Sequence, residues 1–230
     1  MLYNLAFIVI NTTMQIAVAV LLTEIRNKHY RKITQSLMFL PYFISWVIVG
    51  VMAFNIFSSD YGFLNRLIET FGGTPIKFYT TPKAWPFILV FFNVWKGIGY
   101  GSVMYLAAIM GIDTSIYEAA RIDGANVFQR IFKVTIPMIM PTTIILLLLS
   151  VGGIFKGNFD MFYNLVGSNG LLYNYTDVID TLTFRALISS NDFGMSAAVG
   201  LYQSVLCFIT VVIVNKLVGL YDKDLSLIHI

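Results

Sequence analysis

The side chains of this chain that could act as acids, bases or metal ligands are few and widely spaced. Residues 156–192 carry several carboxylates, and Asp177 and Asp180 are close enough in sequence to suggest an acid pair or a metal site. No histidine or convincing ligand set accompanies them. The single cysteine, Cys207, lies in an apolar stretch, which rules out an intrachain disulfide. We therefore predict neither catalytic residues nor a metal site.

The polar segment Glu118–Pro137 suggests binding to a partner protein. It is helix-patterned and separates two long apolar stretches. Asp113 or Ser115 can cap a short helix at its start. Ser115 and Glu118 also fit the capping-box pattern, in which a hydroxyl and a carboxylate bond free amides.

The same pattern predicts how the first helix ends and a second begins. Ala119 and Ala120 leave a flat face that another backbone can approach, and Gly124 allows the turn that stops the helix. A second short helix is expected from about Asn126, and Pro137 marks the junction with the next apolar stretch. Four of its residues recur at helical spacing: Phe128, Ile131, Phe132 and Thr135. Such a helix can enter a groove on a partner protein or rest on a lipid interface, and the pattern alone leaves both open.

The elements that must position these residues are apolar. Hydrophobic residues make up 57% of the 230 residues and charged residues 12%, against about 45–50% and about 25% in soluble domains. Five stretches can each cross a hydrocarbon core of about 30 Å as a helix. They lie at about 2–22, 33–57, 85–110, 135–155 and 193–220. None alternates with a period of two, as strands of a membrane barrel do, so an all-α, multi-pass membrane bundle is predicted.

The distribution of Lys and Arg predicts the orientation. With the loop 112–134 inside, the inner segments carry nine of these residues and the outer segments five, counting all but Lys96. The positive-inside rule favours this arrangement. Five spans then place the N-terminus outside, which suggests a preceding span absent from this sequence. The apolar tail 225–230 follows a charged run and is a candidate non-native segment. The net charge is +3, and the only basic run in the sequence is at residues 26–32. No nucleic-acid partner is therefore expected.

Several motifs resemble those of a known transport family. The set Glu118, Ala119, Ala120, Asp123, Gly124, Ala125, Phe128, Ile136 and Pro137 resembles the EAA loop of ATP-binding-cassette importer permeases, in the form found in sugar permeases. Ile136 stands where that family commonly has Leu. Residues 39–46, 95–101, 105–109 and 177–181 also resemble polysaccharide and oligosaccharide permeases. The resemblance extends to about Leu220.

The resemblance implies an importer-permease (MetI-like) bundle with five of an expected six spans, in a bacterial plasma membrane. It implies a second permease subunit, a cytoplasmic ATPase dimer and an extracellular solute-binding protein. No cofactor is expected on this chain, because ATP and Mg would be held by the ATPase. Residues 115–132 would dock on that ATPase, with Glu118 pairing with a basic group, completing the capping box, or both. Import of an oligo- or polysaccharide is the implied function.

The substrate path is predicted less directly. Lys96 lies about eleven residues into an apolar stretch, where a charge is costly and is a functional candidate by default. Nearby Trp95, Asn93 and Tyr100, and more weakly Trp46, could stack on sugar rings or bond hydroxyls, and a basic centre suits acidic sugars. Equally, Lys96 could bind backbone carbonyls or an acid of the second permease. The Gly-rich run 97–101 is expected to permit close helix contact or a local break.

Three alternatives remain. A membrane-embedded enzyme should show clustered catalytic side chains near one face, which are not found here. An ion-coupled secondary transporter should carry carboxylates at mid-membrane, whereas all twelve acids lie in loops or at the ends of spans. An importer permease for a non-sugar solute would keep the same loop and differ only in its path.

Overall fold

The computed structural model describes residues 1–25 and 27–221, and the regular elements in this part of the chain are all helices, with no strand. The tail 225–230 lies outside the described residues. Contacts divide the chain into two compact units. Unit 1 comprises Met1–Phe7, Phe43–Asn93 and Gly153–Leu206, and unit 2 the described parts of Ile8–Tyr42, Val94–Gly152 and Cys207–Ile230. Three long helices, α1 (Leu2–Glu24), α5 (Trp85–Met110) and α13 (Phe193–Tyr221), contribute residues to both units.

Apolar helices long enough to cross a membrane are present. α1, α5 with the turn before it, and α13 each pass this test alone. Two interrupted pairs raise the number to five if each counts as one span. The first pair is α2 (Lys28–Phe43) and α3 (Trp46–Phe57), where Ser45 caps α3 by accepting from the Ile48 amide at 3.4 Å. The second, Val127–Met138 with α9 (Met140–Val151), bends by 57° at Ile139.

Many large apolar side chains point outward, which suits a lipid environment. On α13, Leu201 and Phe208 are 70% and 68% exposed. A soluble domain rarely leaves such a continuous apolar surface open. The surface therefore agrees with the membrane bundle that the composition predicted.

Unit 1 is held by buried polar contacts as well as apolar packing. It contains α3, α4 (Phe63–Thr70), η1 (Phe78–Thr80), η2 (Pro82–Ala84), α10 (Phe159–Val166), α11 (Tyr173–Thr176) and α12 (Ile179–Ser190). The buried Asn65 amide donates to the carbonyls of Ser58 (3.1 Å) and Ile76 (2.9 Å). The indole of Trp85, fully buried, donates to the Phe78 carbonyl at 2.9 Å. These bonds hold residues 58–85 in a defined conformation up to the start of α5.

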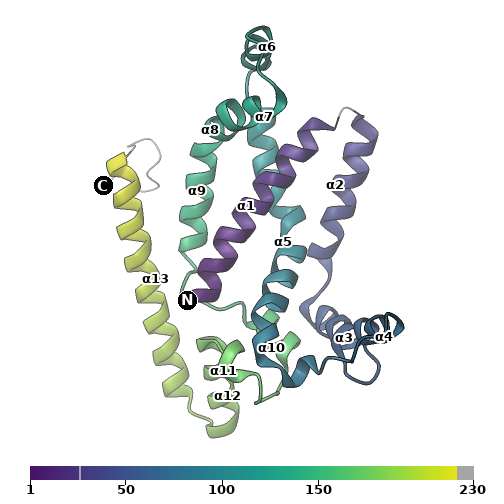
Figure 1. Ribbon diagram of the computed structural model, residues 1–230. Coiled ribbons are helices and arrows are strands. Elements are labelled where there is room, and N and C mark those ends of the chain that lie inside the picture. The colour runs from purple at the N-terminus through teal and green to yellow at the C-terminus, as the bar shows by residue number, and fades with distance from the viewer. Residues whose placement is uncertain (26, 222–230) are drawn as a thin grey trace. The chain divides into compact units, whose positions relative to one another are not determined.

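Unit 2 is built on contacts of α5 with α1 and α2. Its core holds Ala19, Tyr105, Ile109 and Ile139, all at most 5% exposed. A Cβ atom on Gly99 would overlap the backbone of Met38 in α2, and one on Gly101 would overlap the Gln15 amide in α1. The expected close helix contact at the Gly-rich run is therefore confirmed. Within unit 2, α6 (Thr114–Ile122) projects beyond the neighbouring helix ends (Figure 1).

Candidate functional site: the 113–138 segment and the Lys96 cluster

The start of α6 is capped by Asp113. Its carboxylate accepts from the Ser115 amide at 2.9 Å. This leaves Ser115 inside the helix, so the capping box expected from Ser115 and Glu118 is wrong. Hydrogen bonds from the Ser115 backbone amide, and then from its hydroxyl, hold the pKa of Asp113 below its usual value.

The end of α6 is a Schellman motif centred on Gly124, whose φ is +78°. The Gly124 amide donates to the Arg121 carbonyl (3.0 Å) and the Ala125 amide to the Ala120 carbonyl (2.9 Å). Both bonds satisfy carbonyls that the helix leaves unpaired. A positive φ is costly for any residue with a Cβ, which explains the glycine and confirms the predicted stop.

The second helix begins with a capping box formed by Asn126 and Gln129; the sequence predicted the helix start near Asn126 but not the role of Gln129. α7 (Val127–Arg130) begins after Asn126, whose carbonyl oxygen Oδ1 accepts from the Gln129 amide at 2.9 Å. The Gln129 side chain in turn accepts from the Asn126 amide at 2.8 Å. This is a reciprocal capping box. The sequence predicted such a box at the start of α6, whereas the structure has it at the start of α7. The predicted start near Asn126 is confirmed.

A π-helical turn, η3 (Ile131–Thr135), follows α7 and runs into α8 (Ile136–Met138). The four residues predicted to share one apolar face are divided between two faces. Phe128 and Phe132 are 73% and 66% exposed, whereas Thr135 is buried and Ile131 packs on the core of unit 2. One side of the segment therefore belongs to the bundle and the other is open.

Among the described residues, a side-chain hydrogen bond between Tyr117 and Thr135 ties α6 to the bundle. The hydroxyls of Tyr117 and Thr135 lie 3.0 Å apart, and Thr135 also reaches the Arg130 carbonyl at 3.4 Å. The Tyr117 ring packs against the core cluster of unit 2. This hydrogen bond connects α6 directly to η3.

The open side of the segment is apolar with a charge beside it. Ile122 at the end of α6 is 86% exposed, and Phe128 lies across the Gly124 turn. Glu118 and Ala119 are exposed, and Ala120 is half-buried. Within the described residues the Glu118 carboxylate has no hydrogen bond or ion pair. Both helices are capped at their N-termini, and their exposed apolar side chains form a surface suited to docking.

Lys96, on α5, binds the backbone at the end of α2. Its ammonium donates to the carbonyls of Tyr42 (2.7 Å) and Pro41 (3.2 Å). The last carbonyls of a helix have no partner inside it, and a cation there also complements the helix dipole. Of the alternatives left open by the sequence, the structure supports binding of carbonyls.

Aromatic rings surround this contact. Tyr42 and Tyr100 stack with centroids 4.3 Å apart, and the Lys96 ammonium lies 5.7 Å from the Tyr42 ring. Trp95 precedes Lys96 on α5 and is half-buried. The other two candidates, Asn93 and Trp46, belong to unit 1, where the Asn93 amide contacts the Met161 sulfur at 3.6 Å. The structure thus brings Lys96 and Tyr100 together through Tyr42.

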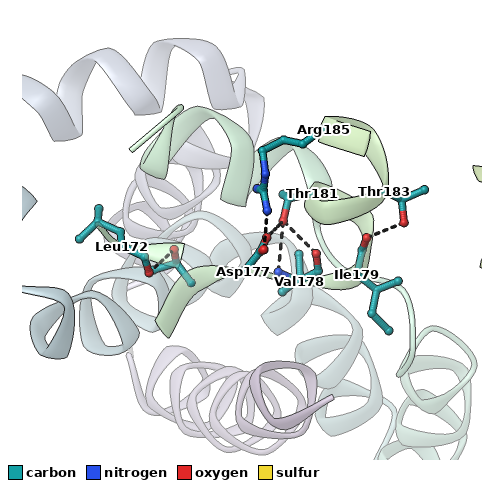
Figure 2. A network of polar contacts seen from close by, with 8 residues as sticks. Leu172, Asp177, Val178, Ile179, Thr181, Thr183 and Arg185 are labelled. Carbon is teal, nitrogen blue, oxygen red and sulfur yellow. Dashed lines mark hydrogen bonds and ion pairs between the residues drawn. The ribbon is translucent and has the colours of Figure 1, made fainter. Parts of the chain in front are cut away.

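The paired carboxylates have separate structural partners. Figure 2 shows Asp177 bonded to Arg185 and, at 2.6 Å, to the Thr181 hydroxyl. Asp180 instead accepts from the Gly157 amide at 2.5 Å. The described residues hold no group of three potential metal-ligating side chains. These contacts anchor the start of α12.

The fold and the 113–138 segment together define an integral membrane component of a transport system. Residues 6–219 match the family model described as "Binding-protein-dependent transport system inner membrane component", and the chain belongs to that family. The family description places the chain in the inner membrane. Members of this family are components of transporters and are not themselves enzymes.

Relatives include permeases whose names state a carbohydrate cargo. Protein LplB of Bacillus subtilis is 33% identical over 90% of this chain, and the polygalacturonan/rhamnogalacturonan transport system permease protein YteP of the same species is 31% identical over 91%. The arabinooligosaccharides transport system permease protein AraP of Halalkalibacterium halodurans is 30% identical over 96% of this chain and 69% of its own length. This chain spans 64% of the length of LplB and of YteP.

A solved structure shares the fold. The chain resembles one in the crystal structure of a bacterial alginate ABC transporter in complex with an alginate pentasaccharide-bound periplasmic protein. The TM-score is 0.86 with 31% identity, covering 94% of this chain and 76% of the other. The expected importer-permease architecture is therefore confirmed.

Proposed function

We propose that this chain is the membrane-spanning permease subunit of an ATP-driven importer of oligo- or polysaccharides. The observation that carries the proposal is the helix pair α6–α7. Both helices are capped at their N-termini, and the pair exposes Ile122 and Phe128 and is hydrogen-bonded to the bundle through Tyr117 and Thr135.

Its partners are a second permease subunit, a cytoplasmic ATPase dimer and an extracellular solute-binding protein. The family description names a binding protein, and the alginate transporter structure contains a periplasmic one. ATP and Mg are held by the ATPase, and this chain binds no cofactor of its own. The function that the segment performs is mechanical coupling.

The coupling residues have distinct roles. Ala119 and Ala120 let the ATPase approach the α6 backbone, and Glu118 pairs with a basic group on it. Asp123 and Gly124 set the turn, Ala125 completes the Schellman bond, and Phe128 fills an apolar pocket of the partner. Pro137 marks the entry into the membrane. Closure of the ATPase dimer would then move α6 and, through Thr135, the helices behind it.

Carbohydrate is the substrate class that the relatives support. Cargoes named for similar proteins include polygalacturonan or rhamnogalacturonan, arabinooligosaccharides and alginate. We place Trp95, Asn93, Tyr100 and Trp46 along the path, where rings can stack on sugars. Lys96 contributes to the path indirectly, because its bonds to the Pro41 and Tyr42 carbonyls hold the end of α2.

Reconstitution tests the proposal. The chain is co-expressed with its candidate ATPase and second permease, and ATP hydrolysis is measured with and without sugar-loaded binding protein. Stable co-purification and stimulated hydrolysis are expected. If the chain neither retains the ATPase nor responds to any loaded binding protein, the proposal is wrong.

A further inference from the structure

A groove in unit 2 lies between the start of α2 and the end of α5. Its volume is about 500 Å³. One wall carries Lys28, Arg31 and Lys32, and the other carries apolar residues of α5. These apolar residues include Val103, Ala107 and Met110. Neither wall belongs to the 113–138 segment or to the Lys96 contact.

Within the described residues, no acidic side chain pairs with the basic wall. Lys28, Arg31 and Lys32 follow the i, i+3, i+4 spacing of one helix face, so their like charges repel one another. In the part of the chain that the structure describes, none of the three forms an ion pair. The Asn27 side chain already accepts from the first-turn amides of His29 (2.9 Å) and Tyr30 (3.3 Å). The positive charge of the site therefore comes from the side chains.

The facing wall supplies an apolar surface next to these charges. Val103, Ala107 and Met110 lie at i, i+4 and i+7 along α5, and Met110 is 62% exposed. The groove thus has a cationic rim where α2 begins and an apolar wall beside it. A soluble anion would use only the rim, whereas an amphiphile would use both parts.

The geometry points to a binding site for an anionic phospholipid of the cytoplasmic leaflet. The phosphate lies among Lys28, Arg31 and Lys32, and an acyl chain lies along α5. The positive-inside rule places this end of α2 on the cytoplasmic side, where basic pockets between membrane helices attract anionic headgroups. This site is separate from the proposed coupling function and does not depend on it.

Native mass spectrometry of the purified transporter complex tests the site. The complex is titrated in detergent with dioleoyl phosphatidylglycerol, with dioleoyl phosphatidylcholine of the same chains, and with inorganic phosphate. Phosphatidylglycerol should bind best, and the Arg31→Gln/Lys32→Gln variant should bind it about fivefold more weakly for each charge removed. The variant Arg66→Gln/Lys77→Gln, which removes the same charges from exposed positions of unit 1, should bind as the wild type does.

A second variant tests the apolar wall while retaining the charges. Ala107→Trp fills the groove and should lower phosphatidylglycerol binding without affecting phosphate. Equal binding of both lipids, or unchanged binding by Arg31→Gln/Lys32→Gln, overturns the proposal. Phosphate competing as well as phosphatidylglycerol overturns it in favour of an anion site. Absence of any lipid from the assembled complex overturns it in favour of a subunit interface.

Discussion

The hydroxyl oxygens of Tyr117 in α6 and Thr135 in η3 lie 3.0 Å apart, although the residues are 18 positions apart in the chain. Thr135 is buried at 4% exposure, whereas most of α6 is exposed. This bond therefore joins the exposed helix α6 to the packed interior of unit 2.

Replacing Tyr117 by Phe should loosen that connection while keeping the ring in the core. Loss of one hydrogen bond costs about 1 kcal/mol, so thermal stability should fall slightly. Stimulation of ATP hydrolysis by loaded binding protein should fall further than stability does. Tyr30→Phe is the control, because Tyr30 is 62% exposed and far from this contact in sequence. Equal stimulation in Tyr117→Phe and wild type would contradict the role of the bond.

Gly124→Val should uncouple ATP hydrolysis from transport. The φ of +78° at Gly124 costs a residue with a Cβ about 1–2 kcal/mol, and a Cβ atom placed there meets no non-neighbouring atom within 4 Å. The effect is thus on backbone conformation alone. Gly72 has the same φ and equally open surroundings, so Gly72→Val is a matched control for strain. Transport and ATPase assays should separate the two variants, and similar losses in both would argue against a coupling role.

Ile122→Asp should weaken binding of the ATPase with little change in folding. The side chain is 86% exposed, so it contributes to the docking surface more than to the core. Each 1.4 kcal/mol of lost contact lowers affinity about tenfold. Pull-down of the ATPase provides the measurement. Phe71→Asp, at a position 83% exposed in unit 1, should bind the ATPase normally. An unchanged yield of ATPase with Ile122→Asp would remove this residue from the interface.

Lys96→Met should destabilise the protein, because two carbonyls at the end of α2 lose their donor. Hydrogen bonds from a charged group contribute about 1.5–3 kcal/mol. Thermal unfolding in detergent should therefore shift clearly, and Lys96→Arg should restore part of the loss. If Lys96 instead contacts the sugar, stability stays constant and only the dependence of transport on substrate concentration changes.

The start of α6 should fray at low pH. Asp113 has a lowered pKa in the folded state, so its contribution is present above the ordinary value of 3.8 and is lost as pH falls through the folded value. Hydrogen exchange of the α6 amides should rise in that window, after correction for the intrinsic rate. Asp113→Asn keeps a capping oxygen and should abolish this pH dependence. Persistence of the dependence in that variant would assign it to another carboxylate.

Local signals in the sequence predicted much of the 113–138 segment. Gly124 indicated the turn because few other residues tolerate its backbone, and helical spacing predicted the next helix from about Asn126, whose side chain caps it in the structure. Capping depends on neighbours in the chain, so the pattern is informative. Even so, Asp113 and Ser115 were both plausible caps, and only the backbone geometry decides between them.

Contacts between distant residues could not be predicted in the same way. The bond between Tyr117 and Thr135 needs the packing of η3, and the Lys96 contact needs the end of α2 beside α5. Both are set by the tertiary arrangement of helices, which spacing along one helix does not encode. The Gly-rich run predicted close approach but not that Met38 is the residue approached.

In the π-helical turn Ile131–Thr135, each backbone hydrogen bond spans five residues. The hydrogen bonds of the α-helices on either side span four. Each residue of an α-helix rotates the chain by about 100°. Residues after Thr135 are consequently out of phase by about that angle with an α-helix continued from Val127–Arg130. Deleting Val134 would reset the phase and turn Pro137 toward a different neighbour. The turn therefore sets the rotation of α8 relative to α7.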